Sequence, residues 1–345
     1  MKIKTLLPFI CFALLFSCKA GTSETPSDTE KKVITFAKGA DISWVTEMES
    51  RGYKFYNAAG QQRECTALMA ELGCNMVRLR VWVNPENGWC GKDDVLVKCR
   101  RAQALGMRIM IDFHYGDSWC DPGKQPVPAA WKDYGPQQMA QAVADHTRDV
   151  LGCLKNAGID VTWVQVGNEV ENGMLWESGR VKGGEAGNFA SYFNAGAQVV
   201  KELYPDAVVV LHISNAWKND TLVWFYDLMK TAGVNYDMIG LSLYPSYWEN
   251  GEYPDWQPKA KASVANFQLL HINYGKPVML VEFGMPASQD EASRDCLQYI
   301  MDGVAGFDWF KGIILWEPES EHSRNGYDYG AFKDGKATMA MDPFK

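Results

Sequence analysis

Two glutamates stand out because each ends an otherwise apolar stretch. Glu169 closes the run Val161–Glu169, directly after Asn168, and Glu282 lies near the end of the run Pro277–Gly284. Apolar runs of this length are typical of strands that are buried on both faces of a parallel sheet. Because an ionised carboxylate is costly to bury without a partner, we expect both side chains to open into a cleft. Two carboxyl groups facing one cleft could hydrolyse a glycosidic bond. The alternative is that one or both pair with a basic residue at a strand end.

The elements that would position these residues alternate along the chain. Strand-like segments occupy 37–43, 76–83, 108–115, 162–169, 207–214, 238–245, 277–284 and 312–318. Helical patterns occupy 64–72, 94–105, 136–157, 185–204, 220–232, 258–273 and 289–306. The chain after Pro318 is polar and loop-like, so an eighth helix is the least well supported. This alternation predicts an α/β protein, a (β/α)8 TIM barrel that forms a single catalytic domain over residues 36–345. An open doubly wound sheet is the competing architecture, but no Gly-x-Gly-x-x-Gly loop follows the first strand, which disfavours that sheet and a nucleotide cofactor.

The polar residues of these strands fall, nearly all of them, in the last half of a strand or just beyond it. They are Asp41, Arg78, Arg80, Asp112, His114, Asn168, Glu169, His212, Asn215, Ser242, Tyr244, Glu282, Trp316 and Glu317. In a barrel, these positions meet at the C-terminal mouth, where such enzymes carry their active sites. The sequence therefore predicts one site at that mouth.

Composition restricts the partners. The chain has 345 residues, 47% hydrophobic, with a formal net charge of −8 and no basic stripe, which argues against binding to nucleic acid. A neutral polymer is compatible with this charge. Thirteen tryptophans suit a carbohydrate site, because flat aromatic faces can cover the apolar faces of sugars, although core packing accounts for a share of them.

Several motifs together resemble glycoside hydrolase family 53, the endo-β-1,4-galactanases of clan A. Besides the two glutamates, they are Gly39–Ser43, Arg78–Pro85, Asp112–Trp119, Gln165–Glu169, Ser242–Pro245 and Trp316–Pro318. The resemblance covers about 38–318 and implies a retaining enzyme that cleaves β-1,4-galactan, including the type I arabinogalactan side chains of pectin, without a cofactor. Another clan A endo-glycanase, such as a xylanase or mannanase, is the alternative enzyme, since the glutamate pair is shared. A non-catalytic surface glycan-binding lipoprotein is the alternative outside enzymes.

The resemblance also implies roles. Glu169 would be the general acid/base and Glu282 the nucleophile, which requires carboxyl groups about 5–5.5 Å apart. Arg78 and Tyr244 would hold Glu282 ionised, and Asn168 would bind the sugar 2-hydroxyl. Trp316 would lie beneath the sugar. The remaining candidates for the site are Asp41, His114, Trp119 and His212, and for Arg80 a structural ion pair is equally compatible.

The sequence departs from the family pattern at three places. Cys120 stands where the family has Ala, and Met285 stands where a Trp is common, which puts the aromatic lining on that side in doubt. The stretch 287–291 lacks the ligand pattern of the calcium loop that some bacterial relatives carry. We therefore expect no metal.

The first residues read as a targeting segment. Residues 1–17 combine basic Lys2 and Lys4 with a short apolar stretch, and the residues before Cys18 resemble a bacterial lipoprotein cleavage box. We expect Cys18 to carry lipid, residues 18–35 to form a tether, and the protein to be an exported lipoprotein of the cell envelope, attached to the membrane only through that lipid. An ordinary signal peptide cut nearby is the alternative.

Export makes disulfides possible, and seven cysteines follow Cys18. Cys90 and Cys120 lie in loops that would be neighbours in a barrel, so we expect a bond between them. We expect the protein to be a monomer.

Overall fold

The computed structural model describes residue 1 and residues 36–345. The predicted signal segment 1–17, the lipidated Cys18 and the tether 18–35 lie outside the described residues, so these remain predictions.

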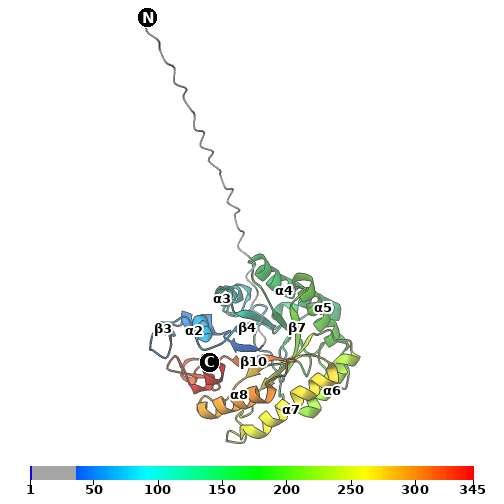
Figure 1. Ribbon diagram of the computed structural model, residues 1–345. Helices are drawn as coiled ribbons and strands as arrows, with labels where there is room; N and C mark the ends of the chain where they lie inside the picture. The colour runs from blue at the N-terminus through cyan, green and yellow to red at the C-terminus, as the bar shows by residue number, and fades with distance from the viewer. Residues whose placement is uncertain (2–35) are drawn as a thin grey trace. The chain divides into compact units, whose positions relative to one another are not determined.

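Eight parallel strands close into a barrel, in the order β1-β10-β9-β8-β7-β6-β5-β4. They are β1 (Ala37–Asp41), β4 (Met76–Val81), β5 (Arg108–Phe113), β6 (Trp163–Val166), β7 (Val208–Ile213), β8 (Met238–Leu243), β9 (Val278–Phe283) and β10 (Phe310–Trp316). All eight predicted strands are present. The predicted (β/α)8 barrel in a single domain is confirmed, and Figure 1 shows the strands at its centre with helices around them.

Seven helices cover the barrel as predicted. They are α2 (Cys65–Glu71), α3 (Lys92–Ala104), α4 (Pro136–Asn156), α5 (Gly187–Leu203), α6 (Asn219–Thr231), α7 (Trp256–Tyr274) and α8 (Asp290–Val304). In α4, Pro136 occupies the first turn, where its missing N–H is not needed, and Val143 and Leu154 face the core. Gly158 follows the helix with a φ of +73°, which is the left-handed conformation expected of a glycine that ends a helix.

Several short elements outside the eight barrel strands and the seven covering helices escaped prediction. They are α1 (Val45–Ser50), η1 (Ala129–Trp131), α9 (His322–Asn325), η2 (Met339–Phe344) and a small sheet of β11 (Phe332–Lys333), β12 (Lys336–Ala337), β2 (Phe55–Tyr56) and β3 (Gln62–Arg63). In place of a long eighth helix, η2 packs against α8, and Lys38 Nζ on β1 donates a hydrogen bond to the Phe344 carbonyl at 2.9 Å. The C-terminal segment therefore attaches to the strand that begins the barrel.

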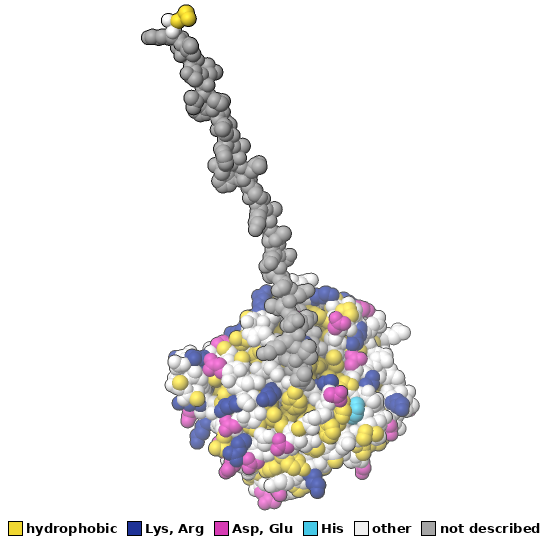
Figure 2. Space-filling view, in the orientation of Figure 1, with side chains coloured by type: hydrophobic (Ala, Val, Ile, Leu, Met, Phe, Trp, Pro, Cys, Tyr) yellow, Lys and Arg dark blue, Asp and Glu magenta, His cyan; other side chains and the backbone are white. Residues whose placement is uncertain are grey.

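The surface seen in Figure 2 carries Lys, Arg, Asp and Glu side chains mixed with hydrophobic ones, without a region of one charge sign. Within residues 36–345, no helix combines the length and the apolar character needed to span a bilayer.

Candidate active site

Glu169 reaches the mouth of the barrel through a tight turn after β6. Gly167 has a φ of +84°, and a Cβ on it would lie 2.7 Å from Cγ1 of Val170. Glu169 itself has a φ of +48°, a conformation that residues other than glycine seldom adopt. Strained backbone of this kind persists where the surrounding structure holds it, often at functional sites. The turn places the Glu169 side chain on a cavity of about 400 Å³ at the C-terminal ends of the strands.

Glu282 lies on β9 and lines the same cavity. Its Oε1 is 2.8 Å from Nη2 of Arg78, and its Oε2 accepts a hydrogen bond from the Tyr244 hydroxyl at 3.0 Å. The pairing with a basic residue that we weighed as an alternative is therefore present for Glu282. It does not remove the carboxyl group from the cavity.

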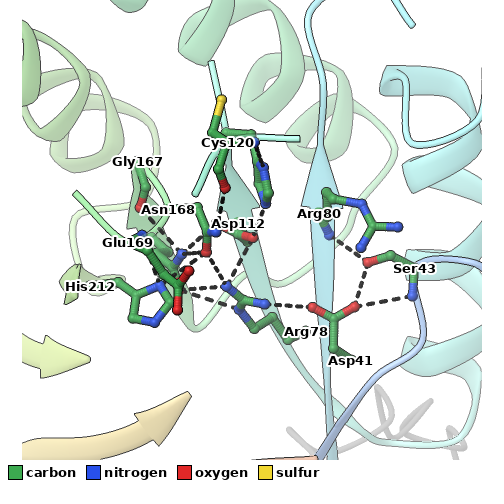
Figure 3. Close-up of polar contacts among 12 residues, drawn as sticks. Asp41, Ser43, Arg78, Arg80, Asp112, Cys120, Gly167, Asn168, Glu169 and His212 are labelled. Carbon is green, nitrogen blue, oxygen red and sulfur yellow. Dashed lines mark hydrogen bonds and ion pairs between the residues drawn. The ribbon is translucent and has the colours of Figure 1, made fainter. Parts of the chain in front are cut away.

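Arg78, fully buried on β4, joins most of the polar residues of the site. Its guanidinium contacts Asp41 at 2.7 Å, Asp112 at 3.0 Å and Asn168 at 2.9 Å, in addition to Glu282. Figure 3 shows Arg78 between Asp41 on one side and Asn168 and Asp112 on the other. One cation thus faces three carboxyl groups, which share its positive charge.

The surroundings of the two glutamates differ. Burial, the charge of Glu282 and the charge of Glu171 raise the pKa of Glu169 well above its ordinary value. Burial also raises the pKa of Glu282, to about 7, although Arg78 and Tyr244 oppose this shift. Within residues 36–345, Glu169 forms no ion pair with a basic side chain. Of the two carboxyl groups, Glu169 therefore holds its proton more firmly, and Glu282 is the one that ionises first.

The two histidines predicted for the site are neutral, and the ring nitrogens of both contact other groups of the protein. His114 accepts a hydrogen bond from the Cys120 N–H at its Nδ1, 3.2 Å away, and its Nε2 lies 3.0 Å from Oδ2 of Asp112. His212 is fully buried behind Asn168, 3.0 Å from Oδ1 of that residue, and its Nε2 is 2.7 Å from the Ser242 hydroxyl. Burial lowers the pKa of both histidines. His114 lines the cavity, whereas His212 and Asp41 support it from beneath.

Aromatic side chains form the walls. The cavity is lined by Trp119, Tyr244, Tyr247, Trp316, Tyr327 and Tyr329. A second cavity of about 370 Å³ is lined by Trp44, Trp82 and Trp89 and shares Trp119 with the first. On another side, Tyr247 stacks on Tyr329 and continues to Trp248, which is 51% exposed. The site is therefore part of a longer aromatic groove.

Comparison with known proteins shows which family the chain resembles. The model of glycosyl hydrolase family 53 matches residues 37–309, which include both glutamates. The chain belongs to glycosyl hydrolase family 53. The resemblance drawn from the motifs is thus confirmed.

Relatives in family 53 extend over most of the chain. A probable arabinogalactan endo-β-1,4-galactanase A of Aspergillus terreus is 32% identical and covers 81% of this chain and 85% of its own. An arabinogalactan endo-β-1,4-galactanase of Humicola insolens is 30% identical and covers 84% and 91%. A solved fungal β-1,4-galactanase is 29% identical with a TM-score of 0.80 and covers 89% and 98%.

Two of the three departures from the family 53 pattern, Cys120 and Met285, have a structural explanation. Cys120 acts at the site through its backbone, because its carbonyl accepts a hydrogen bond from Asn168 Nδ2 at 2.9 Å. Met285 is buried away from the catalytic cavity, and Tyr327 and Tyr329, from the segment after α9, supply aromatic lining instead. The sequence reasoning missed these two tyrosines because they lie in a segment without periodicity.

The predicted disulfide is wrong. Cys90 and Cys120 both carry free thiols. Cys90 Sγ lies 3.6 Å from the carbonyl of Ser43, whereas Cys120 Sγ lies 3.8 Å from the carbonyl of Ser118. The two loops are neighbours, but the sulfur atoms face different parts of the backbone.

Two glutamines were not assigned roles from the sequence. Gln165 Oε1 accepts a hydrogen bond from Arg78 Nη2 at 3.1 Å, and its Nε2 donates to Asp112 at 2.5 Å. Gln125, from the loop after β5, donates to the carbonyl of Asn168 at 2.8 Å and so holds the turn that carries Glu169. Gln165 lies on β6, the strand that leads to Glu169, so its sequence position could have indicated a role in the site. Gln125 lies in a loop, and its sequence position gives no such indication.

Metal binding finds no support among the residues that the structure describes, where no three His, Cys, Asp or Glu side chains are grouped as ligands. The absence of a metal stays a prediction.

Proposed function

We propose that this protein is a retaining endo-β-1,4-galactanase in which Glu169 is the acid/base and Glu282 is the nucleophile. The observation that carries the proposal is that both carboxyl groups line one cavity of a family 53 barrel, while Arg78 and Tyr244 contact Glu282 alone of the two. Named relatives that act on arabinogalactan support β-1,4-galactan, such as the side chains of pectin, as the substrate.

The reaction has two steps. The ionised Glu282 attacks the anomeric carbon while protonated Glu169 gives its proton to the glycosidic oxygen, so the bond to the leaving sugar breaks and a galactosyl ester of Glu282 forms. Glu169, now ionised, then takes a proton from water, and that water attacks the anomeric carbon and releases Glu282. Two inversions leave the anomeric configuration unchanged. Because Glu169 holds its proton more firmly than Glu282 does, Glu169 suits the role of acid and Glu282 that of nucleophile.

The residues around the pair would hold the sugar. Asn168 Nδ2 gives one hydrogen to the Cys120 carbonyl, which leaves its second hydrogen for the sugar 2-hydroxyl. Trp316 and Trp119 line the cavity and would cover an apolar face of the galactose ring. A hydrogen bond to the 2-hydroxyl strengthens as positive charge develops on the ring in the transition state.

The aromatic groove on both sides of the catalytic cavity supports endo action. The second cavity beyond Trp119 and the exposed rings beyond Tyr247 give sugar units places on both sides of the cleaved bond. An enzyme that removes terminal sugars would instead require a wall at one end.

We also infer that the protein is an exported lipoprotein, with Cys18 lipidated after removal of residues 1–17 and the barrel tethered to the cell envelope. Replacing Cys18 with Ser should move the enzyme from the membrane fraction to the soluble fraction. Retention of the variant in the membrane fraction would contradict a lipid anchor at that residue.

The activity is tested with a panel of pure polysaccharides. We expect release of reducing ends from β-1,4-galactan, with oligosaccharides of mixed length early in the reaction. Activity on xylan or mannan without activity on galactan would replace the assigned substrate. Binding of galactan without any hydrolysis would indicate a surface glycan-binding protein.

A further inference from the structure

Arg80 is a buried cation inside a ring of tryptophans. Its guanidinium carbon lies 4.2 Å from the ring centroid of Trp119, 5.1 Å from Trp82, 5.4 Å from Trp44 and 6.0 Å from Trp316. We name these five residues the Arg80 cage. Arg80 has no exposed surface and lines neither cavity, so it does not contact substrate.

Hydrogen bonding alone does not account for Arg80. Its Nη1 pairs with Glu317 at 2.9 Å, but Nε and Nη2 are buried and have no hydrogen-bond partner among the described residues. Leaving two N–H-bearing nitrogens of a buried charge unpaired is costly unless other contacts compensate. The faces of the surrounding indoles provide that compensation, because an aromatic face attracts a cation within about 6 Å of the ring centroid.

The tryptophans of the Arg80 cage come from four separate segments. Trp44 follows β1, Trp82 follows β4, Trp119 follows β5 and Trp316 ends β10. They also contact one another, with centroid distances from 5.1 Å for Trp82 and Trp119 to 5.8 Å for Trp119 and Trp316. Glu317 strengthens the link, because its other oxygen accepts the Trp44 backbone N–H at 3.2 Å. One guanidinium therefore holds together four parts of the barrel mouth.

The cage tryptophans shape both parts of the groove. Trp119 and Trp316 line the catalytic cavity, and Trp44, Trp82 and Trp119 line the neighbouring cavity. We propose that Arg80 is a positioning residue that sets the orientation of the tryptophan platforms on which the sugar chain binds. A planar guanidinium can stack against several rings at once, whereas the compact ammonium of lysine cannot.

The test compares Arg80→Lys and Arg80→Met with the wild type. A platform that contacts the sugar in both the ground state and the transition state acts mainly on binding, so we expect KM for galactan to rise about tenfold while kcat changes less than about threefold. The near-UV circular dichroism of the coupled tryptophans should change, while the far-UV spectrum of a folded variant stays the same. Arg80→Met keeps an unbranched apolar stem but removes the guanidinium and its charge, so it should show the larger rise in KM.

Arg180→Lys is the matched control, because Arg180 lies 3.9 Å over the ring of Trp176 and is partly exposed. It should retain the KM of the wild type. Folded Arg80 variants with unchanged KM and an unchanged near-UV spectrum would overturn the proposal, as would an equal rise in KM for Arg180→Lys. The inference rests on the proposed function for its kinetic readout, but the spectroscopic comparison requires no substrate. A wild type inactive on galactan would remove the proposed function, whereas an active wild type with unaffected Arg80 variants would remove only the role of Arg80.

Discussion

Arg78 Nη2 lies 2.8 Å from Oε1 of Glu282, and the same guanidinium also holds Asp41 and Asp112. Burial raises the pKa of Asp112, but the charge of Arg78, followed by His114, lowers it. The pKa of Asp112 therefore falls below its ordinary value. Glu282 therefore shares one cation with two aspartates. Burial raises the pKa of Glu282 most, and the neighbouring Asp112 and Asp41 add to this effect, so the pKa stays raised despite a direct ion pair. This relationship provides a basis for several predictions.

The two glutamates should respond differently to the quality of the leaving group. Glu169→Gln and Glu282→Gln should each lower kcat on galactan by several orders of magnitude. With a dinitrophenyl galactobioside, whose leaving group departs without a proton, Glu169→Gln should keep much of its rate for the first step, because only acid assistance has been removed. Glu282→Gln should remain inactive on both substrates. Equal loss by both variants on the activated substrate would contradict the assigned roles.

The pH dependence follows from the same pair. Activity requires Glu282 ionised, so kcat/KM should fall as the pH decreases through the pKa of Glu282, about 7. Activity requires Glu169 protonated, so kcat/KM should fall again as the pH rises through the pKa of Glu169, which lies well above the ordinary value for glutamate. A profile of kcat/KM against pH measures both limbs. An acid limb near pH 4.5 would show that Glu282 is not perturbed as the structure indicates.

Arg78→Lys should move the acid limb. A lysine ammonium cannot contact Asp41, Asp112 and Glu282 together, so Glu282 would lose stabilisation of its charge and its pKa would rise. We expect kcat/KM to fall about a hundredfold and the acid limb to shift to higher pH. Arg148→Lys, on the exposed surface of α4, serves as the control. A variant of Arg78 that loses activity without moving the limb would indicate a structural role instead.

Glu169→Gln should stabilise the fold. Because the folded protein holds the Glu169 proton more firmly than the unfolded chain does, the free energy of unfolding falls as the pH rises above the ordinary value for glutamate. Gln cannot ionise, so we expect its Tm to exceed that of the wild type by about 2–5 °C at pH 8 and to match it near pH 4. Glu202→Gln, at an exposed glutamate whose pKa is lowered by a hydrogen bond with Arg148, should bring no such gain. A lower Tm for Glu169→Gln at pH 8 would contradict this account.

The exposed rings beyond the cavity should matter only for long substrates. Trp248→Ala should raise KM for galactan about fivefold, because the contact of a single aromatic ring with a sugar unit contributes a modest free energy of binding. Hydrolysis of a short aryl oligosaccharide should be unchanged. Trp224, 43% exposed on α6, is the matched control, and Trp224→Ala should leave both substrates unaffected. Equal effects of Trp248→Ala on long and short substrates would exclude this part of the groove.

Much of the site was predictable because its residues occupy strand ends. Glu169 follows β6 and Glu282 is the next-to-last residue of β9, and a barrel brings all strand ends to one mouth. The contact of Arg78 with Glu282 was expected, but the sequence does not specify most pairings of polar groups. The contacts of Arg78 with Asp41 and Asp112, and the tryptophans around Arg80, were therefore not foreseen. The sheet formed by β2, β3, β11 and β12 has strands of two residues, too short to show any alternation.

The central claim is that Glu282 forms the covalent intermediate, and trapping tests it most directly. A 2-deoxy-2-fluoro galactobiosyl fluoride slows both steps but leaves a good leaving group, so the intermediate should accumulate. We predict that mass spectrometry of the digested protein finds the added sugar on the peptide that carries Glu282. The sugar on Glu169, or no adduct together with products of inverted anomeric configuration, would contradict the account.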